Sequence, residues 1–288
     1  MMVGALVYFF VPALVGVLIG IASGLLGIGG GTVMVPIFRL AFGMSATMST
    51  ATSLFAIIPT SISGAISHVK GKTCIPALGI AAGLGGACLS PVGVWLAQLS
   101  PDWLVMLAAA LIIGYSAINM FKKAFKLRPA GQPATGVDAA AAASLTSSGD
   151  AAAAAPTADD SSLSRKQLLQ GAAIGLVAGL ASGYVGVGGG FIMVPLMLSI
   201  IGIPMRKASG TSLIAVMILA IPGVIEQGII GNINYLAGIA IVIGTIPGAV
   251  IGARLVTKVP ERTLRLLFGC FLIVAAVMLV LNEVGIFG

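Results

Sequence analysis

The sequence predicts an all-α polytopic membrane protein built from two inverted-topology repeats, each with about four long helices and a short half-helix. Three observations predict it: the composition, a duplicated glycine motif and the placement of the charges. Of the 288 residues, 58% are hydrophobic and 8% are charged, whereas a soluble domain carries about 25% charged residues. Several apolar stretches exceed the roughly 18 residues that indicate a spanning helix. The chain is therefore expected to lie in a lipid bilayer.

A glycine-rich motif occurs twice. Residues 20–36 read GIASGLLGIGGGTVMVP and residues 179–195 read GLASGYVGVGGGFIMVP, so that every Gly, Ser and Pro matches at one offset, 159 residues (188 − 29). Three consecutive glycines interrupt a long apolar run in each copy, although each glycine costs roughly 1 kcal/mol against alanine inside a helix. In lipid, such a break frees backbone N–H and C=O groups, which need new partners. A duplicated break is typical of the binding site of a transporter.

Ten apolar segments follow from this repeat, five in each half. The second segment of each half has about 12 residues, which at 1.5 Å per residue is too short to span a bilayer as a straight helix. These two segments are therefore either half-helices of re-entrant hairpins or spanning segments completed by extended backbone. The ten segments are 4–27, 32–43, 47–67, 75–98, 103–121, 168–186, 191–203, 208–227, 235–256 and 264–283.

The composition divides the chain into two membrane repeats, residues 1–128 and 164–288, around a linker, residues 129–163. The linker consists mainly of Ala, Ser, Thr, Gly and Pro, and half of the eight acidic residues of the chain lie in it. Since it has almost no large apolar side chain, we expect a disordered segment.

Small residues at fourfold spacing predict close helix packing. A glycine at every fourth position lets the backbones of two membrane helices approach each other. We expect these glycine ridges to lie where the two halves meet. They are Gly16/Gly20/Gly24, Gly171/Gly175/Gly179/Gly183 and Gly244/Gly248/Gly252.

Basic residues predict the orientation, because loops rich in Lys and Arg face the cytoplasm. The loops near 98–102 and 228–234 contain no basic residue. With the linker in the cytoplasm, these loops and both termini are external, and the halves lie in opposite orientations in the plasma membrane. Only Arg39 departs from this pattern. The basic clusters are Lys70/Lys72, Lys122/Lys123/Lys126/Arg128, Arg165/Lys166, Arg206/Lys207 and Arg254/Lys258/Arg262/Arg265. They account for the net charge of +7, so we expect no nucleic-acid partner.

These motifs resemble the sulfite exporter TauE/SafE family of membrane permeases. The resemblance covers both halves and leaves out the linker, which is shorter in many members. It implies transport of small sulfur-containing anions: sulfite, sulfonates such as sulfoacetate, or thiosulfate. Members of the family also handle other organic anions. The residues that carry it are the paired Gly-x-Gly-Gly-Gly breaks with Pro36 and Pro195, and the run Gly244 to Phe268 with Pro247-Gly248-Ala249, Gly252-Ala253-Arg254-Leu255 and Leu264-Arg265.

The glycine breaks are the first candidate for binding a substrate. A helix that restarts after a break offers unpaired N–H donors and a partial positive charge to an anion. Close packing alone is the simpler interpretation. A dinucleotide-binding loop is excluded, because a membrane-length helix precedes each break and no acidic residue follows about 20 residues later. The candidate residues are Gly29, Gly30, Gly31, Gly188, Gly189 and Gly190.

Hydroxyl residues at the start of the third segments are the second candidate. Thr52 and Ser53 match Thr211 and Ser212 at the offset of 159. Their hydroxyls either donate to substrate oxygens or bond the backbone of their own helix, as caps do. Ser23 and Ser182 also match, and we expect them to pack within the glycine-rich helix.

Three ionisable residues are candidates for coupling or gating. Glu226 lies in an apolar segment near its external end, and such groups are functional candidates in membranes. His68 lies at the cytoplasmic end of the matching segment, as a solvated interface residue or a proton carrier. Arg39 lies near the external end of the second segment, where it attracts anions or extends to the interface.

We therefore expect a secondary transporter of small anions that works by alternating access. An anion channel of the same fold and a carrier for other small organic anions are the alternatives. We expect no enzyme, because the single histidine is interfacial and no aspartate lies within a segment. No cofactor and no metal are expected. A proton gradient is one energy source for such a carrier, and Glu226 and His68 are the residues that would carry the proton. The sequence sets neither the direction of transport nor the oligomeric state.

Overall fold

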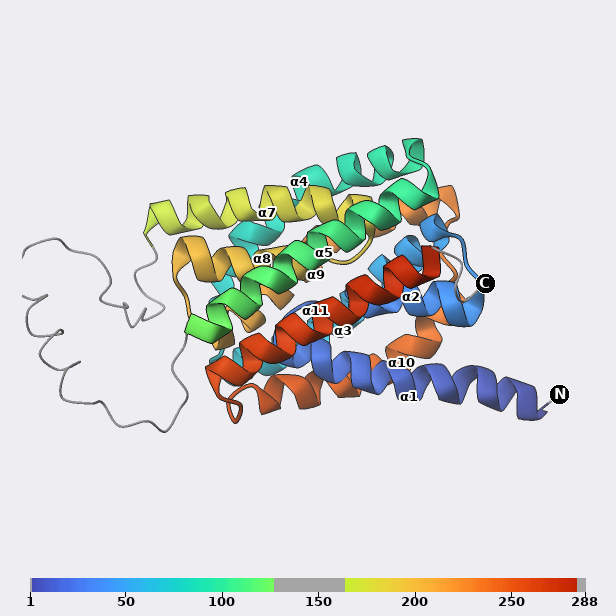
Figure 1. Ribbon diagram of the computed structural model, residues 1–288, viewed down its shortest axis with the longest axis horizontal. Coiled ribbons are helices and arrows are strands. Elements are labelled where there is room, and N and C mark those ends of the chain that lie inside the picture. Colours follow the sequence, from blue (N-terminus) through green and yellow to red (C-terminus); the bar gives the residue numbers. More distant parts are fainter. Residues whose placement is uncertain (1, 127–163, 284–288) are drawn as a thin grey trace, which may run out of the picture.

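The computed structural model describes residues 2–126 and 164–283, and within these ranges it is helical without strands (Figure 1). The predicted linker, 129–163, lies outside the described residues. Every predicted apolar segment corresponds to a helix, and a short π-helical turn, η1, continues α8. The elements are α1 Met2–Leu26, α2 Gly31–Phe42, α3 Ala46–Lys70, α4 Pro76–Leu99, α5 Asp102–Lys126, α7 Arg165–Val185, α8 Gly190–Leu196, η1 Met197–Ile201, α9 Met205–Ile230, α10 Tyr235–Leu255 and α11 Glu261–Glu283.

The two ends of the helix bundle carry different parts of the chain. Helix α5 ends and α7 begins at one end, on the left of Figure 1, which we call the linker end. Helix α1 begins and α11 ends at the other end, which we call the terminal end. Equivalent helices of the two halves, such as α5 and α11, run in opposite directions between these ends (Figure 1).

The short second helix of each half is re-entrant. Helix α2 starts in the interior after α1 and returns toward the terminal end, and α8 with η1 returns toward the linker end (Figure 1). Each has 12 residues: α2 as one helix, α8 and η1 as seven and five. Among the residues that the structure describes, six other helices are long and apolar enough to cross a membrane: α3, α4, α5, α7, α9 and α10. The chain is thus a multi-pass membrane protein.

The two halves interlock through the glycine ridges. Helix α1 packs along α10, and α7 packs along α4. A Cβ atom on Gly16 would lie 2.5 Å from the carbonyl oxygen of Ile241, and one on Gly244 would collide with the carbonyl of Ala13. Since the backbones approach this closely only at glycine, the prediction that the ridges lie where the halves meet is confirmed.

Matched hydrogen bonds repeat this arrangement at the offset of 159 residues. The side chain of Asp102 accepts from the N–H of Ala46 at 3.2 Å, and the side chain of Glu261 accepts from the N–H of Met205 at 3.3 Å. In each half, the acidic residue that begins the fifth helix therefore satisfies a free donor at the start of the third helix.

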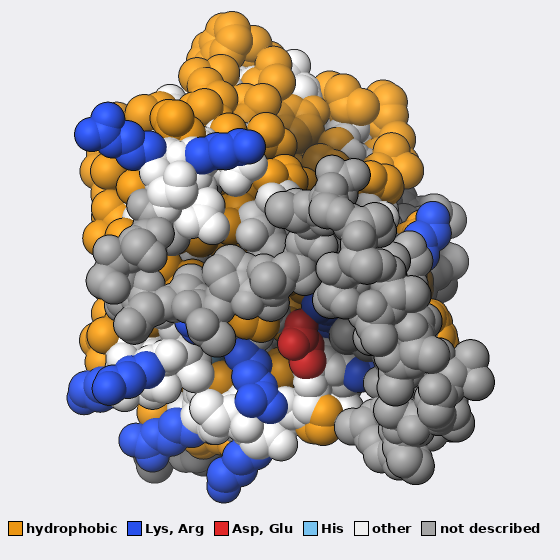
Figure 2. All heavy atoms as spheres, turned by 90° about the vertical axis from the view of Figure 1, so that its left-hand side faces the viewer, with side chains coloured by type: hydrophobic (Ala, Val, Ile, Leu, Met, Phe, Trp, Pro, Cys, Tyr) orange, Lys and Arg blue, Asp and Glu red, His pale blue; other side chains and the backbone are white. Residues whose placement is uncertain are grey.

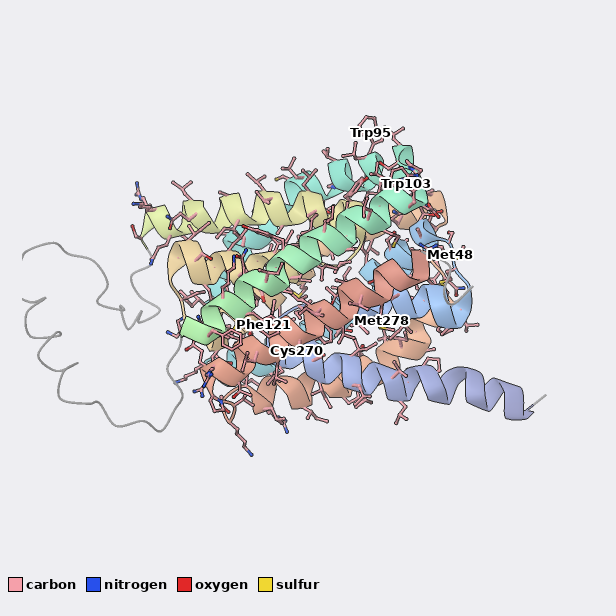
Figure 3. The ribbon with its side chains drawn as sticks, viewed as in Figure 1. Met48, Trp95, Trp103, Phe121, Cys270 and Met278 are labelled. Carbon is pink, nitrogen blue, oxygen red and sulfur yellow. The ribbon has the colours of Figure 1, made fainter. Side chains whose placement is uncertain are left out.

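The surface fits a bilayer. Trp95 of α4 and Trp103 of α5 project outward near the terminal end (Figure 3), and their side chains are 57% and 54% exposed. Tryptophans in this position are typical of a membrane–water interface. Lys and Arg side chains gather on the linker end (Figure 2).

Candidate functional site

The two helix breaks share one backbone geometry. A side chain at positive φ collides with the backbone, so that only glycine adopts it without strain. The chain path itself therefore requires glycine here. The angles are Gly27 75°, Gly29 81° and Gly30 85° in the first break, and Gly186 72°, Gly188 88° and Gly189 66° in the second.

The two breaks lie against each other. A Cβ atom on Gly31, the first residue of α2, would collide with the carbonyl oxygen of Val187 in the second break. One on Gly190, the first residue of α8, would lie 2.9 Å from Cα of Ile28. The N-termini of two re-entrant helices, each the positive end of a helix dipole, thus meet in the protein interior.

Part of each first turn is already hydrogen-bonded. The N–H groups of Val33 and Ile192 donate to the carbonyls of Gly30 and Gly189 at 3.3 and 3.0 Å. The N–H group of Gly190, the first residue of α8, also donates, to the carbonyl of Gly188 at 2.7 Å. The N–H groups of Gly31 and Thr32 have no acceptor within α2, which makes them the candidate donors of the first break.

Two apolar side chains, Ile57 of α3 and Val216 of α9, close the space beside both breaks. They match at the offset of 159, and both are fully buried. A Cβ atom on Gly29 would lie 2.9 Å from Cγ1 of Val216, and one on Gly188 would lie 2.8 Å from Cδ1 of Ile57. Sequence reasoning missed them, because an apolar residue in an apolar segment gives no signal apart from the offset.

The candidate threonines connect the two halves. Thr52 accepts from the N–H of Asn234 at 3.0 Å, and Thr211 accepts from the N–H of Ile75 at 2.9 Å. Asn234 and Ile75 are the N-caps of α10 and α4, so each threonine holds the start of a helix in the other half. Thr211 also donates to the carbonyl of Lys207 at 2.7 Å.

The candidate serines differ from each other. Ser212 donates to the carbonyl of Gly27 at 2.7 Å and so ties α9 to the first break. Its counterpart Ser53 is fully buried, and its Oγ has no partner within the described residues.

Other buried hydroxyls also lack a partner. Two of them lie beside the first break. A Cβ atom added to Gly29 would lie 3.4 Å from Oγ of Ser61, and one added to Gly30 would lie 3.6 Å from Cβ of Ser23. Buried polar atoms are normally paired, so the unpaired hydroxyls of Ser61 and Ser23 beside the breaks are candidate donors to a polar ligand. In the described ranges the unpaired hydroxyls are Ser23, Thr32, Ser49, Ser53, Ser61, Ser90 and Ser182.

His68 is fully buried, so its interpretation as a solvated interface residue is wrong. Its Nε2 lies 2.8 Å from the carbonyl oxygen of Gly24, and its Nδ1 lies 2.7 Å from Oγ1 of Thr73. A carbonyl only accepts, so Nε2 carries a hydrogen, and in the neutral ring Nδ1 accepts from Thr73. At the terminal end the matching pair is Gln227 and Asn232, whose side chains bond at 2.9 Å. His68 thus joins α1, α3 and the loop after α3.

Glu226 and Arg39 lie away from the breaks. Glu226 is ten residues beyond Val216 on α9, about 15 Å along the helix axis; its Oε2 is buried and makes no hydrogen bond within the described chain. Arg39 lies in the last turn of α2, toward the terminal end. The described residues contain no group of three His, Cys, Asp or Glu side chains that would hold a metal ion.

Comparisons with known proteins agree with one another. The family model described as sulfite exporter TauE/SafE matches residues 12–279. The probable membrane transporter protein YunE of Bacillus subtilis is 27% identical over 97% of this chain and 99% of its own length. The probable membrane transporter protein YdhB of the same organism is 26% identical, over 86% and 90%. The sulfite exporter TauE/SafE family protein 3 of Arabidopsis thaliana is 30% identical over 36% of this chain and 23% of its own length. No solved structure matches.

The family model covers both helix breaks, both re-entrant helices and every spanning helix described above. The proteins of this family are membrane transporters and not enzymes. The chain belongs to the sulfite exporter TauE/SafE family.

Proposed function

We propose that the protein is a secondary transporter that moves small sulfur-containing anions, namely sulfite, sulfonates such as sulfoacetate, or thiosulfate, across the plasma membrane. One observation carries the proposal: two helix N-termini meet in the interior beside buried hydroxyls that have no partner. Backbone N–H groups and hydroxyls donate hydrogen bonds, and the N-termini of α2 and α8 both attract negative charge. A small oxyanion with several acceptor oxygens suits such a ring of donors.

The absence of a buried cation favours transport over permanent binding. No Lys or Arg side chain within 12–122 and 164–278, where side chains are described, is fully buried. Helix dipoles and hydrogen bonds therefore neutralise the anion incompletely, and an incompletely neutralised anion is released readily.

Alternating access is proposed for the two halves. Their equivalent helices run in opposite directions (Figure 1), and their capping bonds match at one offset. Two such halves, related by a pseudo-twofold axis in the membrane plane, exchange conformations when one rocks against the other. The basic linker end faces the cytoplasm in this proposal, and both termini are external.

Counterflow in proteoliposomes tests the proposal. Purified protein in vesicles preloaded with sulfite is expected to take up radiolabelled sulfite in a saturable manner, and thiosulfate or sulfoacetate should compete. Single-channel currents in place of saturable exchange would show the anion channel. Exchange of carboxylates but of no sulfur anion would show a carrier for other organic anions, and both results contradict the proposal.

A further inference from the structure

A pocket of about 480 Å³ lies at the linker end, between the loop after α3 and the starts of α9 and α11. Among the described residues that line it, three side chains are basic and one, that of Glu261, is a carboxylate, which is paired with Arg265 and accepts from the N–H of Met205. The described lining therefore carries an excess of positive charge. Its lining residues are Lys72, Thr73, Pro204, Arg206, Lys207 and Glu261.

The equivalent positions at the terminal end carry no basic residue. At the offset of 159, the three cations correspond to Gly231, Thr47 and Met48, the last of which is labelled near the terminal end in Figure 3. The carboxylate is retained, since Asp102 corresponds to Glu261 and caps the third helix in the same way. The cations thus belong to one face of the molecule and are not required by the repeated architecture.

Lys72 has an unfavourable backbone conformation for a lysine. Its φ angle is 53°, and it is the one residue other than glycine with a positive φ in the described chain. Its counterpart in the matching turn, Gly231, has a φ of 85° and adopts this angle without steric strain because it has no side chain. Because side chains carry a steric penalty at positive φ, a lysine here indicates a use for its charge.

A chain of contacts through His68 links the pocket to the first break. Thr73 lines the pocket and bonds Nδ1 of His68, whose Nε2 bonds the carbonyl of Gly24 just ahead of the first break. Helix α9 packs tightly against this contact, since a Cβ atom on Gly210 would lie 2.8 Å from Nδ1 of His68. The buried ring therefore lies between Thr73, which lines the pocket, and Gly24, which precedes the first break.

We propose that this pocket is the loading site for the anion at the linker end: it collects a small oxyanion, which reaches the breaks when the contact between Thr73 and His68 opens. The inference rests on the proposed function. A cleft lined by one sign of charge raises the local concentration of the opposite ion. The apparent KM for sulfite is then lower at the linker face than at the terminal face.

The variant Lys72→Gly tests the proposal, because it installs the residue of the matching turn and removes the backbone penalty, so that it should fold. Sulfite uptake is measured in vesicles with the linker face outside and in vesicles with the terminal face outside, in phosphatidylcholine alone. We expect the KM to rise at least about threefold at the linker face and to stay unchanged at the terminal face. Lys166→Gln, which removes an exposed charge of the same end outside the pocket, should change neither value.

The reciprocal variant Gly231→Lys, at a position where nothing lies within 4 Å of a Cβ atom, should lower the KM at the terminal face. An equal rise at both faces for Lys72→Gly, or an equal effect of Lys166→Gln, would overturn the loading site while leaving transport itself established. An effect of Lys72→Gly that appears only when anionic phosphatidylglycerol is added would assign the lysine to a lipid headgroup and overturn the proposal. A wild-type protein without saturable sulfite transport would instead contradict the proposed function.

Discussion

At the scale of the residue, the buried hydroxyls of α3 and α9 fall into two groups. Thr52, Thr211 and Ser212 bond the backbone of the other half, so they hold the fold together. Ser53 and Ser61 are equally buried but unpaired. Only the second group is free to donate to a substrate, and substitutions separate the two roles.

Ser53→Ala should weaken sulfite binding without weakening the fold. The hydroxyl has no protein partner to lose, whereas a hydrogen bond to a charged ligand contributes roughly 1.5–3 kcal/mol, a tenfold loss of affinity or more. Calorimetry of the purified variant gives the affinity, and thermal unfolding gives the stability. An unchanged affinity would remove Ser53 from the site.

Thr52→Val should act mainly on stability. It leaves the part-buried N–H of Asn234 without its acceptor, which costs about 1 kcal/mol. Thermal unfolding in detergent is expected to show a lower midpoint than for Ser53→Ala. If Thr52→Val unfolds like the wild type, then the bond across the halves does not stabilise the protein.

Sequence reasoning identified the positions of these residues but not their partners. The offset of 159 made Thr52 and Thr211 candidates, yet the N–H groups that donate to them lie in the opposite half, and a single chain gives no sign of contacts between halves. His68 was misjudged for the same reason: its place near a helix end suggested solvent, whereas α1 and α9 cover it.

At the scale of the element, glycine ridges and helix breaks follow directly from the sequence. The triple glycines predicted where α1 and α7 end, because a helix interior tolerates them poorly. Whether the short segments cross or return was open, since length alone does not give direction. The return of α2 follows from its position between an interior break and the start of α3 at the terminal end.

Gly248→Leu should destabilise the contact between α1 and α10. A Cβ atom at Gly248 would collide with the carbonyl of Val17, and overpacking of this kind costs about 1–3 kcal/mol. Gly114→Leu is the matched control, because nothing lies within 4 Å of a Cβ atom there. Equal unfolding temperatures for the two variants would contradict the account of the ridges.

At the scale of the whole molecule, the halves form one interlocked body. Helix α1 of the first half packs against α10 of the second, and α7 of the second half packs against α4 of the first. The two breaks are also in contact with each other. Neither half is therefore expected to form the site alone.

The proposed orientation is tested by cysteine labelling. Gln98, at the terminal end, and Lys258, at the linker end, are both exposed. In a background without Cys74, Cys88 and Cys270, an impermeant thiol reagent added to intact cells should label a cysteine at Gln98 and not one at Lys258. The opposite labelling would reverse the orientation.

The most direct test of the central claim, that the two breaks form a single anion site, is a calorimetric titration of sulfite into the purified protein and its glycine variants. Gly30→Ala and Gly189→Ala each place a side chain at positive φ in one break, and Gly43→Ala places one at a positive φ of 62° with nothing within 4 Å. The backbone penalty is similar, about 1 kcal/mol in each case. We predict one sulfite per chain, lost in both break variants and retained in Gly43→Ala. Two sulfites per chain, or a loss of half the sites in each break variant, would contradict the claim.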